Sequence, residues 1–183
     1  GDAIVHAAPL SHGSGLYVVP HVAQGAVNVI AESGGFDAVE LPGLLAHWNR
    51  ALLFAAPTMV KRLVRSPALG GAALAHLKCL VFGGGPMYVA DCREAFAALG
   101  PRLAQIYGQG ESPMTITAMN RHVLADAIAR DDDARLGSVG TAQTGIDVRI
   151  GDERAGDDDG TRGDGAGGQP GEVLVRGATV MQG

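Results

Sequence analysis

The stretch from Leu77 to Thr117 most constrains how this 183-residue chain can fold. Two short apolar runs in it, Cys79–Phe82 and Leu103–Tyr107, have the length expected of strands buried on both faces of a sheet. Between them, apolar residues recur at helical spacing and predict an amphipathic helix: Val89, Cys92, Phe96 and Leu99. A strand–helix–strand unit crosses over with a right hand, so the two strands are expected to be parallel. Their carboxyl ends then meet at one sheet edge, where ligands bind in open α/β folds.

The alternation of strands and helices extends back to the start of the chain. Apolar runs predict strands at Ala3–Ala7, Ala26–Ile30 and Ala51–Ala55. Helices are expected at Leu16–Ala23 (interrupted or kinked at Pro20), at Glu40–Asn49 and at Thr58–Arg65. The pattern predicts an α/β fold, a mainly parallel sheet flanked by helices, over residues 1–120.

After Thr117 the pattern changes, and we expect a linker followed by the start of a small β subdomain over residues 121–183. Val123–Ala129 is expected to form one or two helical turns, and Asp131–Asp133 a solvated run of charge. Asp147–Ile150 and Glu172–Arg176 are predicted strands. Residues 151–171 are dense in Gly and Asp, which predicts a mobile hairpin loop. The loop lacks the spacing of a calcium-binding EF-hand.

Charge and composition restrict the class of protein. The net charge of −5, with no basic run, argues against a nucleic-acid surface. Neither a signal peptide nor an apolar stretch long enough to span a bilayer is evident, so we expect a cytoplasmic protein. Cys79 and Cys92 fall inside predicted elements and are expected to be buried thiols, not a disulfide or metal pair. The chain does not begin with Met and stops just after a strand, so we expect a fragment of a longer protein.

Four features carry candidate chemistry, and each has an alternative interpretation. The turn Gly83-Gly84-Gly85-Pro86 lets a ligand approach the backbone, or is simply a tight turn. Tyr107 ends a strand, where its ring can face a nucleobase or merely cover the sheet rim. Glu111 can hold Mg²⁺ or remain a solvated surface carboxylate. His12 is a candidate base or gate on a loop, although no partner for it is visible.

Taken together and in order, six segments resemble the adenylate-forming superfamily, which includes acyl-CoA synthetases, luciferases and adenylation domains of peptide synthetases. The segments read PLSHGSG, AAPTMV, VFGGGPM, IYGQGES, GSVGTAQTGIDVRI and GEVLVRGATVMQG. The match covers nearly the whole chain except the Gly/Asp loop. It implies an ATP-dependent carboxylate:CoA ligase that forms an acyl-adenylate, with ATP, Mg²⁺ and coenzyme A as cofactors or co-substrates. A small carboxylic acid is then the substrate, and fatty acid metabolism the expected setting.

The resemblance also implies roles for single residues. Tyr107 of the motif Tyr107–Glu111 corresponds to the tyrosine that stacks on adenine, with Gly108, Gln109 and Gly110 beside it. Glu111 corresponds to the carboxylate that reaches Mg²⁺ and phosphate. Gly83, Gly84, Gly85 and Pro86 line the adenine and the carboxylate end of the acid pocket. His12 is placed where the acid tunnel and the thiol channel meet.

Two departures from the family pattern limit these expectations. Gly110 stands where the motif has a threonine whose hydroxyl contacts phosphate. The phosphate loop expected before Ala3 and the catalytic lysine expected after Gly183 are missing. We therefore expect half an active site and an inactive chain when it is isolated. An adenylation domain that loads a carrier protein, or a non-catalytic nucleotide-binding or interaction module of the same fold, remains an alternative.

Overall fold

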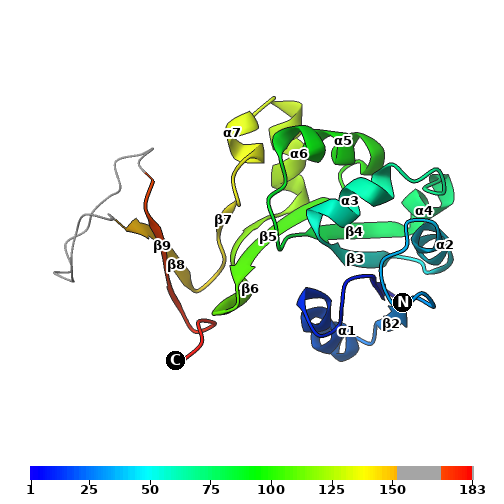
Figure 1. The fold of residues 1–183 in the computed structure, drawn as a ribbon, viewed down its shortest axis with the longest axis horizontal. Helices are drawn as coiled ribbons and strands as arrows, with labels where there is room; N and C mark the ends of the chain where they lie inside the picture. The colour runs from blue at the N-terminus through cyan, green and yellow to red at the C-terminus, as the bar shows by residue number, and fades with distance from the viewer. Residues whose placement is uncertain (152–169, 183) are drawn as a thin grey trace.

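A computed structural model describes residues 1–151 and 170–182 of the chain (Figure 1). It confirms the expected α/β fold: a seven-stranded, mostly parallel sheet carries helices, and a separate two-stranded antiparallel sheet follows. The hairpin loop expected at 151–171 lies outside the described residues except at its two ends. The division between residues 120 and 121 stays a prediction.

The elements alternate along the chain. The strands are β1 (Ala3–His6), β2 (Val27–Ile30), β3 (Ala51–Ala55), β4 (Leu77–Phe82), β5 (Leu103–Gln109), β6 (Ser112–Met119), β7 (Thr141–Ala142), β8 (Ile146–Gly151) and β9 (Glu172–Gly177). The helices are the short 3₁₀ helix η1 (Gly13–Tyr17) and α1 (Val18–Ala23), α2 (Glu40–His47), α3 (Pro57–Val64), α4 (Gly71–His76), α5 (Val89–Leu99), α6 (Arg121–Ala129) and α7 (Asp133–Leu136).

The strand order of the large sheet is β2-β1-β3-β4-β5-β6-β7. All pairs from β2 to β5 are parallel, and β6 and β7 join antiparallel. The strands β1, β3, β4 and β5 consequently all end at one edge, which we call the carboxyl edge. The candidate site residues lie at the carboxyl ends of these strands or in the segments that follow them: Tyr107, Gly108 and Gln109 are the last residues of β5.

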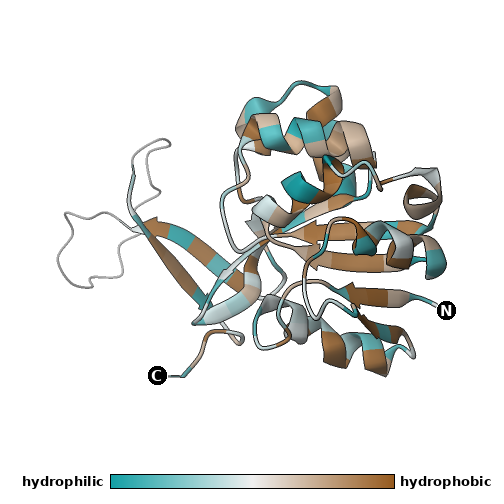
Figure 2. Ribbon diagram, turned by 45° about the vertical axis from the view of Figure 1, so that its right-hand side comes forward, coloured by the Kyte–Doolittle hydropathy of each residue, from teal (hydrophilic) through white to brown (hydrophobic). Residues whose placement is uncertain are grey.

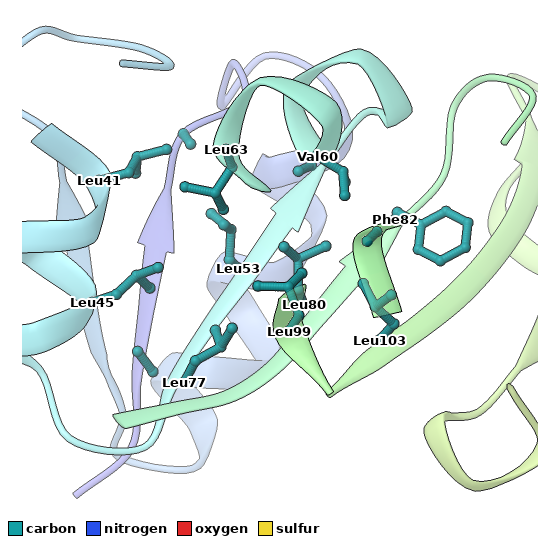
Figure 3. Packing of buried hydrophobic residues seen from close by; sticks show 14 of the residues in the cluster. Leu41, Leu45, Leu53, Val60, Leu63, Leu77, Leu80, Phe82, Leu99 and Leu103 are labelled. Atoms are coloured by element: carbon teal, nitrogen blue, oxygen red, sulfur yellow. The ribbon is translucent and has the colours of Figure 1, made fainter. Parts of the chain in front are cut away.

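The core lies between one face of the sheet and the helices α2 to α6 (Figure 3). Leu53, Leu80 and Leu103, on neighbouring strands, are at most 1% exposed. Leucines of α2 and α3 and Leu99 of α5 pack against them. Each fully buried leucine contributes roughly 1.5–3 kcal/mol of hydrophobic stabilisation. These contacts hold the carboxyl edge on a rigid base.

The other face of the sheet corrects the expectation of strands buried on both faces. Within the described part of the chain, η1 covers β1 and β3 on this face, where Ile4 and Phe54 are buried, and α1 packs beside β2. On β4 and β5, Val81 and Ile106 of that face are half-buried. Figure 2 nevertheless shows strands in the middle of the large sheet coloured as apolar along most of their length. The apolar runs thus correctly predict strands but overstate how completely this chain covers them.

Pro20 does not kink its helix. It is the third residue of α1, where a backbone N–H would have no acceptor within the helix, so proline removes no hydrogen bond.

The predicted alternation of strands and helices also lacks α4, a helix that begins after Gly70 and packs beside α2.

The run Asp131–Asp133 is exposed, but it is more than a solvated charge run. Arg93 of α5 pairs with Asp131 at 3.0 Å and with Asp133 at 2.6 Å, while the Asp132 carboxylate caps α7 by accepting from the Arg135 N–H. The run therefore fastens the α6–α7 connection to α5.

The two cysteines are free thiols; Cys92 is buried, as expected, whereas Cys79 is only partly buried. Burial raises the pKa of both thiols, which favours their neutral form. None of the helices in residues 1–151 and 170–182 is both long and apolar enough to cross a membrane.

Candidate active site

The glycine turn after β4 is required by how closely β4 and β5 approach. Gly83 is buried, and a Cβ there would lie 2.6 Å from the carbonyl oxygen of Ile106. Gly84 has φ +79°, a left-handed conformation that glycine adopts without strain. Gly85 and Pro86 are exposed beyond it. The first residue of the turn, Gly83, therefore packs against β5, and the backbone of the following residues is exposed to solvent at the carboxyl edge.

The segment after β5 is a tight antiparallel hairpin, not the open polar loop expected at Gly108–Ser112. Strand β5 continues through Gln109, and β6 begins at Ser112. Tyr107 pairs with Thr117, but Gln109 pairs with Ser112, so three extra residues of β6 bulge out. Met114, in this bulge, has φ +61°. A Cβ on Gly108 would lie 2.1 Å from the Met114 nitrogen, so only glycine fits opposite the bulge.

Tyr107 and Gln109 form a linked pair at the end of β5. The amide Nε2 of Gln109 donates a hydrogen bond to the Tyr107 hydroxyl oxygen at 2.7 Å. The two residues are two positions apart on one strand, so their side chains leave the same face. Because its hydroxyl is held, Tyr107 offers a ligand mainly the face of its half-buried ring.

Glu111 lies exposed at the hairpin tip, and contacts with the end of the chain hold that tip in place. The Glu111 carbonyl accepts a hydrogen bond from the Met181 N–H at 2.7 Å. The hydroxyls of Ser112, Thr115 and Thr179 form a closed triangle with sides of 2.8 to 3.1 Å. The sequence analysis missed Thr115 and Thr179. Thr115 is near enough to Glu111 to be suspected, but Thr179 is 67 residues from Ser112.

The donor set fits a magnesium ion that arrives with phosphate. No cluster of three or more His, Cys, Asp or Glu side chains suited to a metal is found within residues 1–151 and 170–182. Glu111 therefore supplies a single carboxylate. Mg²⁺ typically binds through one or two carboxylates and completes its shell with water and substrate phosphates. A metal ion held by protein ligands alone does not fit this tip.

His12 lies exposed on the loop after β1, and a buried histidine, His6, supports that loop. The Nε2 of His6 contacts the Asn28 side-chain oxygen at 2.8 Å, and its Nδ1 contacts the Ser14 hydroxyl at 2.7 Å. Because an amide oxygen only accepts, Nε2 carries the proton and Nδ1 accepts from Ser14. This network fixes η1, which begins next to His12. The sequence gives no sign of it, because His6 lies within a continuous buried strand.

The structure brings the glycine turn and the Tyr107–Glu111 segment together, because β4 and β5 are neighbours and Gly83 contacts Ile106. His12 is farther along the edge, since β3 lies between β1 and β4. Residues of β3 and of the segment after it lie between the two parts: a Cβ on Gly13 would lie 2.6 Å from the Phe54 ring, and a Cβ on Gly85 would lie 3.7 Å from Pro57. The candidate residues thus line one continuous edge.

Comparison with known proteins identifies the family of the chain. The family model described as "AMP-binding enzyme" matches residues 1–183. The chain belongs to the AMP-binding enzyme family. Among curated family members, it is 28% identical to the medium/long-chain-fatty-acid–CoA ligase FadD8 of Mycobacterium tuberculosis over 72% of the chain and 22% of that protein. It is 27% identical to a feruloyl-CoA synthase of an Amycolatopsis species over 97% of the chain and 33% of that protein.

Solved structures of the family agree. The amide bond synthetase McbA from Marinactinospora thermotolerans aligns over 99% of the chain and 34% of its own, with a TM-score of 0.80 and 26% identity. ATP-bound MatB from Rhodopseudomonas palustris aligns over 100% and 33%, with a TM-score of 0.73 and 29% identity. The chain therefore spans about a third of the length of such AMP-binding enzymes. The resemblance to adenylate-forming enzymes is confirmed.

Proposed function

We propose that this chain is the adenine-side part of an ATP-dependent carboxylate:CoA ligase that acts through an acyl-adenylate. One observation carries the proposal. In an AMP-binding family chain, the glycine turn of β4 and the Tyr107–Glu111 hairpin lie side by side at the carboxyl edge of the sheet. The curated relatives named as fatty-acid–CoA ligase and feruloyl-CoA synthase support the thiol ligase reading.

In this proposal the ring of Tyr107 stacks on adenine, and the backbone of Gly84 to Pro86 lines the other side. Stacking on one aromatic ring contributes roughly 1–3 kcal/mol. The hydrogen bond from Gln109 keeps the ring in the orientation that stacking needs. Gly110, where a Cβ would meet no atom within 4 Å, leaves the backbone open between the base and the phosphates, whereas Gly108 packs against the Met114 bulge and lets the hairpin form.

The first chemical step joins the acid to the nucleotide. A carboxylate oxygen of the acid attacks the α-phosphorus of ATP, the bond from that phosphorus to the bridging oxygen breaks, and pyrophosphate leaves. Glu111 is placed to hold Mg²⁺, which when bound neutralises charge on the phosphate oxygens. Exact placement of the Glu111 carboxylate depends on the tip, which Met181 and the hydroxyl triangle hold.

The second step transfers the acyl group to a thiol. The thiol loses its proton to solvent, its sulfur attacks the acyl carbonyl carbon, the bond to the adenylate oxygen breaks, and AMP leaves. We place His12 beside the junction of acid and thiol, because it lies on the same edge but away from Tyr107. The cytoplasmic location expected from the sequence stays a prediction.

The acceptor is the least constrained part of the proposal. The amide bond synthetase McbA aligns with a TM-score of 0.80, which favours an amine as a second candidate acceptor. A carrier-protein thiol is the acceptor in the carrier-loading alternative. Gly110, in place of the phosphate-contacting threonine, gives some weight to a non-catalytic module.

The experiment uses the longer protein that contains this chain, with ATP, Mg²⁺ and a panel of aliphatic and aromatic acids. Hydroxylamine traps an acyl-adenylate as a hydroxamate, so hydroxamate formation reports the first step alone. Coenzyme A, a carrier protein or an amine is then offered as acceptor. Hydroxamate together with acyl-CoA supports the ligase. Hydroxamate without acyl-CoA moves the assignment to another acceptor, and no hydroxamate with any acid favours the non-catalytic module.

A further inference from the structure

A cavity of about 330 Å³ opens at the edge of the large sheet opposite the candidate active site. Five basic side chains line it, and we call it the cationic pocket: Arg50, His76, Lys78, Arg102 and Arg121. Arg50, Lys78 and Arg102 stand at the beginnings of β3, β4 and β5, and Arg121 follows the antiparallel β6. Four elements far apart in sequence therefore converge there.

The pocket is separate from the proposed nucleotide site. Strand β4 runs from Leu77, which lines the pocket, to Phe82, which precedes the glycine turn. Six residues of extended strand span roughly 20 Å. A ligand held by the cationic pocket cannot also contact Gly83 or Tyr107 unless it is about that long.

Positive charge in the pocket exceeds what nearby carboxylates neutralise. Asp2 is the carboxylate paired with pocket residues in the described part of the chain: it contacts Arg50 Nε at 2.5 Å and also pairs with Lys78. Hydrogen bonds from Arg50 and then Lys78 hold the pKa of Asp2 at about 2. Arg102 and Arg121 form no ion pair among residues 1–151 and 170–182.

Arg102 is fixed in place with donors to spare. Its Nε donates to the Leu77 carbonyl at 3.0 Å and its Nη1 to the Leu99 carbonyl at 2.8 Å. A guanidinium has five N–H donors, so Nη2 remains for a ligand. Arg121 is exposed, and its contact with the neighbouring His122 ring is a weak one of 3.4 Å. One rigid and one adaptable guanidinium are thus present.

His76 also lines the pocket, on the side of Ala75 and Leu77. Its Nδ1 is buried without a hydrogen-bond partner among the described residues, so this atom does not face the open cavity. The charge available to a ligand therefore comes from the lysine and the arginines.

We propose that the cationic pocket binds a phosphate anion of the size of pyrophosphate. A guanidinium group can donate two parallel hydrogen bonds to the oxygens of a phosphate. The positive side chains surround the pocket from four elements, which suits a multiply charged tetrahedral group better than a single planar carboxylate. Free pyrophosphate and the diphosphate of a nucleotide share this chemistry. The site lies beyond the proposed ligase reaction and does not depend on it.

The test follows backbone amide shifts of the ¹⁵N-labelled 183-residue chain during titration with pyrophosphate at low ionic strength. Arg121→Gln removes one pocket guanidinium. Arg130→Gln is the matched control, because Arg130 caps the carboxyl end of the same helix, is also exposed and carries the same charge, but pairs with Asp126 outside the pocket. A second titration with ADP gives its dissociation constant at the same residues. Tighter binding of ADP than of pyrophosphate indicates a nucleotide as the ligand, and the reverse indicates free pyrophosphate.

We expect saturable shifts at Leu77, Lys78 and Arg102, and weaker binding in Arg121→Gln by about tenfold, the effect of losing one charge-assisted contact. Arg130→Gln should stay within about twofold of the wild type, since exposed charges at a distance are screened. The proposal is overturned if shifts occur only at Gly83–Gly85, if both variants weaken binding equally, or if no saturation is reached.

Discussion

Replacing Gly108 with alanine should disrupt the β5–β6 hairpin, whereas the same change at Gly110 should not. The two glycines are two residues apart and flank Gln109. A Cβ on Gly108 would lie 2.1 Å from the Met114 nitrogen and 2.7 Å from its Cα, which are backbone atoms that no side-chain rotation can move away. A Cβ on Gly110 would meet no atom within 4 Å.

The size of the effect follows from these contacts. Extra atoms forced into a packed region typically cost 1–3 kcal/mol, and a clash with backbone belongs at the upper end, so we expect about 3 kcal/mol for Gly108→Ala. In a chain of this length each kcal/mol lowers Tm by roughly 2–4 °C, which gives a decrease of roughly 6–12 °C. Gly110→Ala should remain within about 0.5 kcal/mol of the wild type.

Urea unfolding of the 183-residue chain, followed by far-ultraviolet circular dichroism, measures both variants. The hairpin holds Tyr107 and Glu111, so Gly108→Ala should also reduce adenylation in the longer protein. Equal stability of the two variants would refute the argument that β5 and β6 approach too closely for a side chain. Gly110→Thr, which restores the motif residue, should be accommodated for the same reason that Gly110→Ala is.

Three further predictions follow from other parts of the molecule. Tyr107→Ala should raise the KM for ATP of the longer protein by an amount equivalent to roughly 1–3 kcal/mol, and Tyr107→Phe should change it little; a Phe variant as impaired as Ala would contradict stacking. Asp2 has its pKa held at about 2, below the ordinary 3.8, so its contribution to stability is present above pH 3.8 and is lost as the pH falls toward 2. Thermal unfolding of Asp2→Asn and wild type should therefore differ at neutral pH and converge near pH 2, and a gap that stays constant would exclude the Arg50 and Lys78 pairing. The isolated 183-residue chain should fold yet catalyse no ATP–pyrophosphate exchange with any acid, because groups that act as a unit lose nearly all their effect when some are absent; exchange above background would show a more self-contained site.

Much of the fold could be predicted because its strands are strongly apolar. The strand Ala51–Ala55 is found with the bounds expected, and Val89–Leu99 forms one helix with its apolar residues on the core side. In both elements, the spacing of apolar residues along the sequence and the packing in the core favour the same secondary structure.

The hairpin after Tyr107 could not be predicted, because its sequence resembles a loop. Gly108, Gly110 and Pro113 are residues typical of turns, yet Gly108 lies within β5 and Pro113 within β6. Pairing with β5 through a bulge, not local propensity, makes this segment a strand. The expected role of the segment at the carboxyl edge did not depend on that assignment.

Polar contacts between residues far apart in the sequence could not be predicted either. His6 meets Ser14 and Asn28, and Thr179 meets Ser112, only because the chain has already folded. No spacing rule relates residues that lie 22 or 67 positions apart. Motif order located the edge, but the contacts that support His12 and Glu111 required the structure.

We expect Glu111 to lie on the phosphate and metal side of an adenylate-forming site. ATP–pyrophosphate exchange in the longer protein, measured for Glu111→Gln with circular dichroism as a check of folding, tests it most directly. A neutral amide binds Mg²⁺ poorly, so exchange should fall by roughly two orders of magnitude or more while the fold is unchanged. Exchange within about twofold of wild type would remove Glu111 from the site and contradict the account.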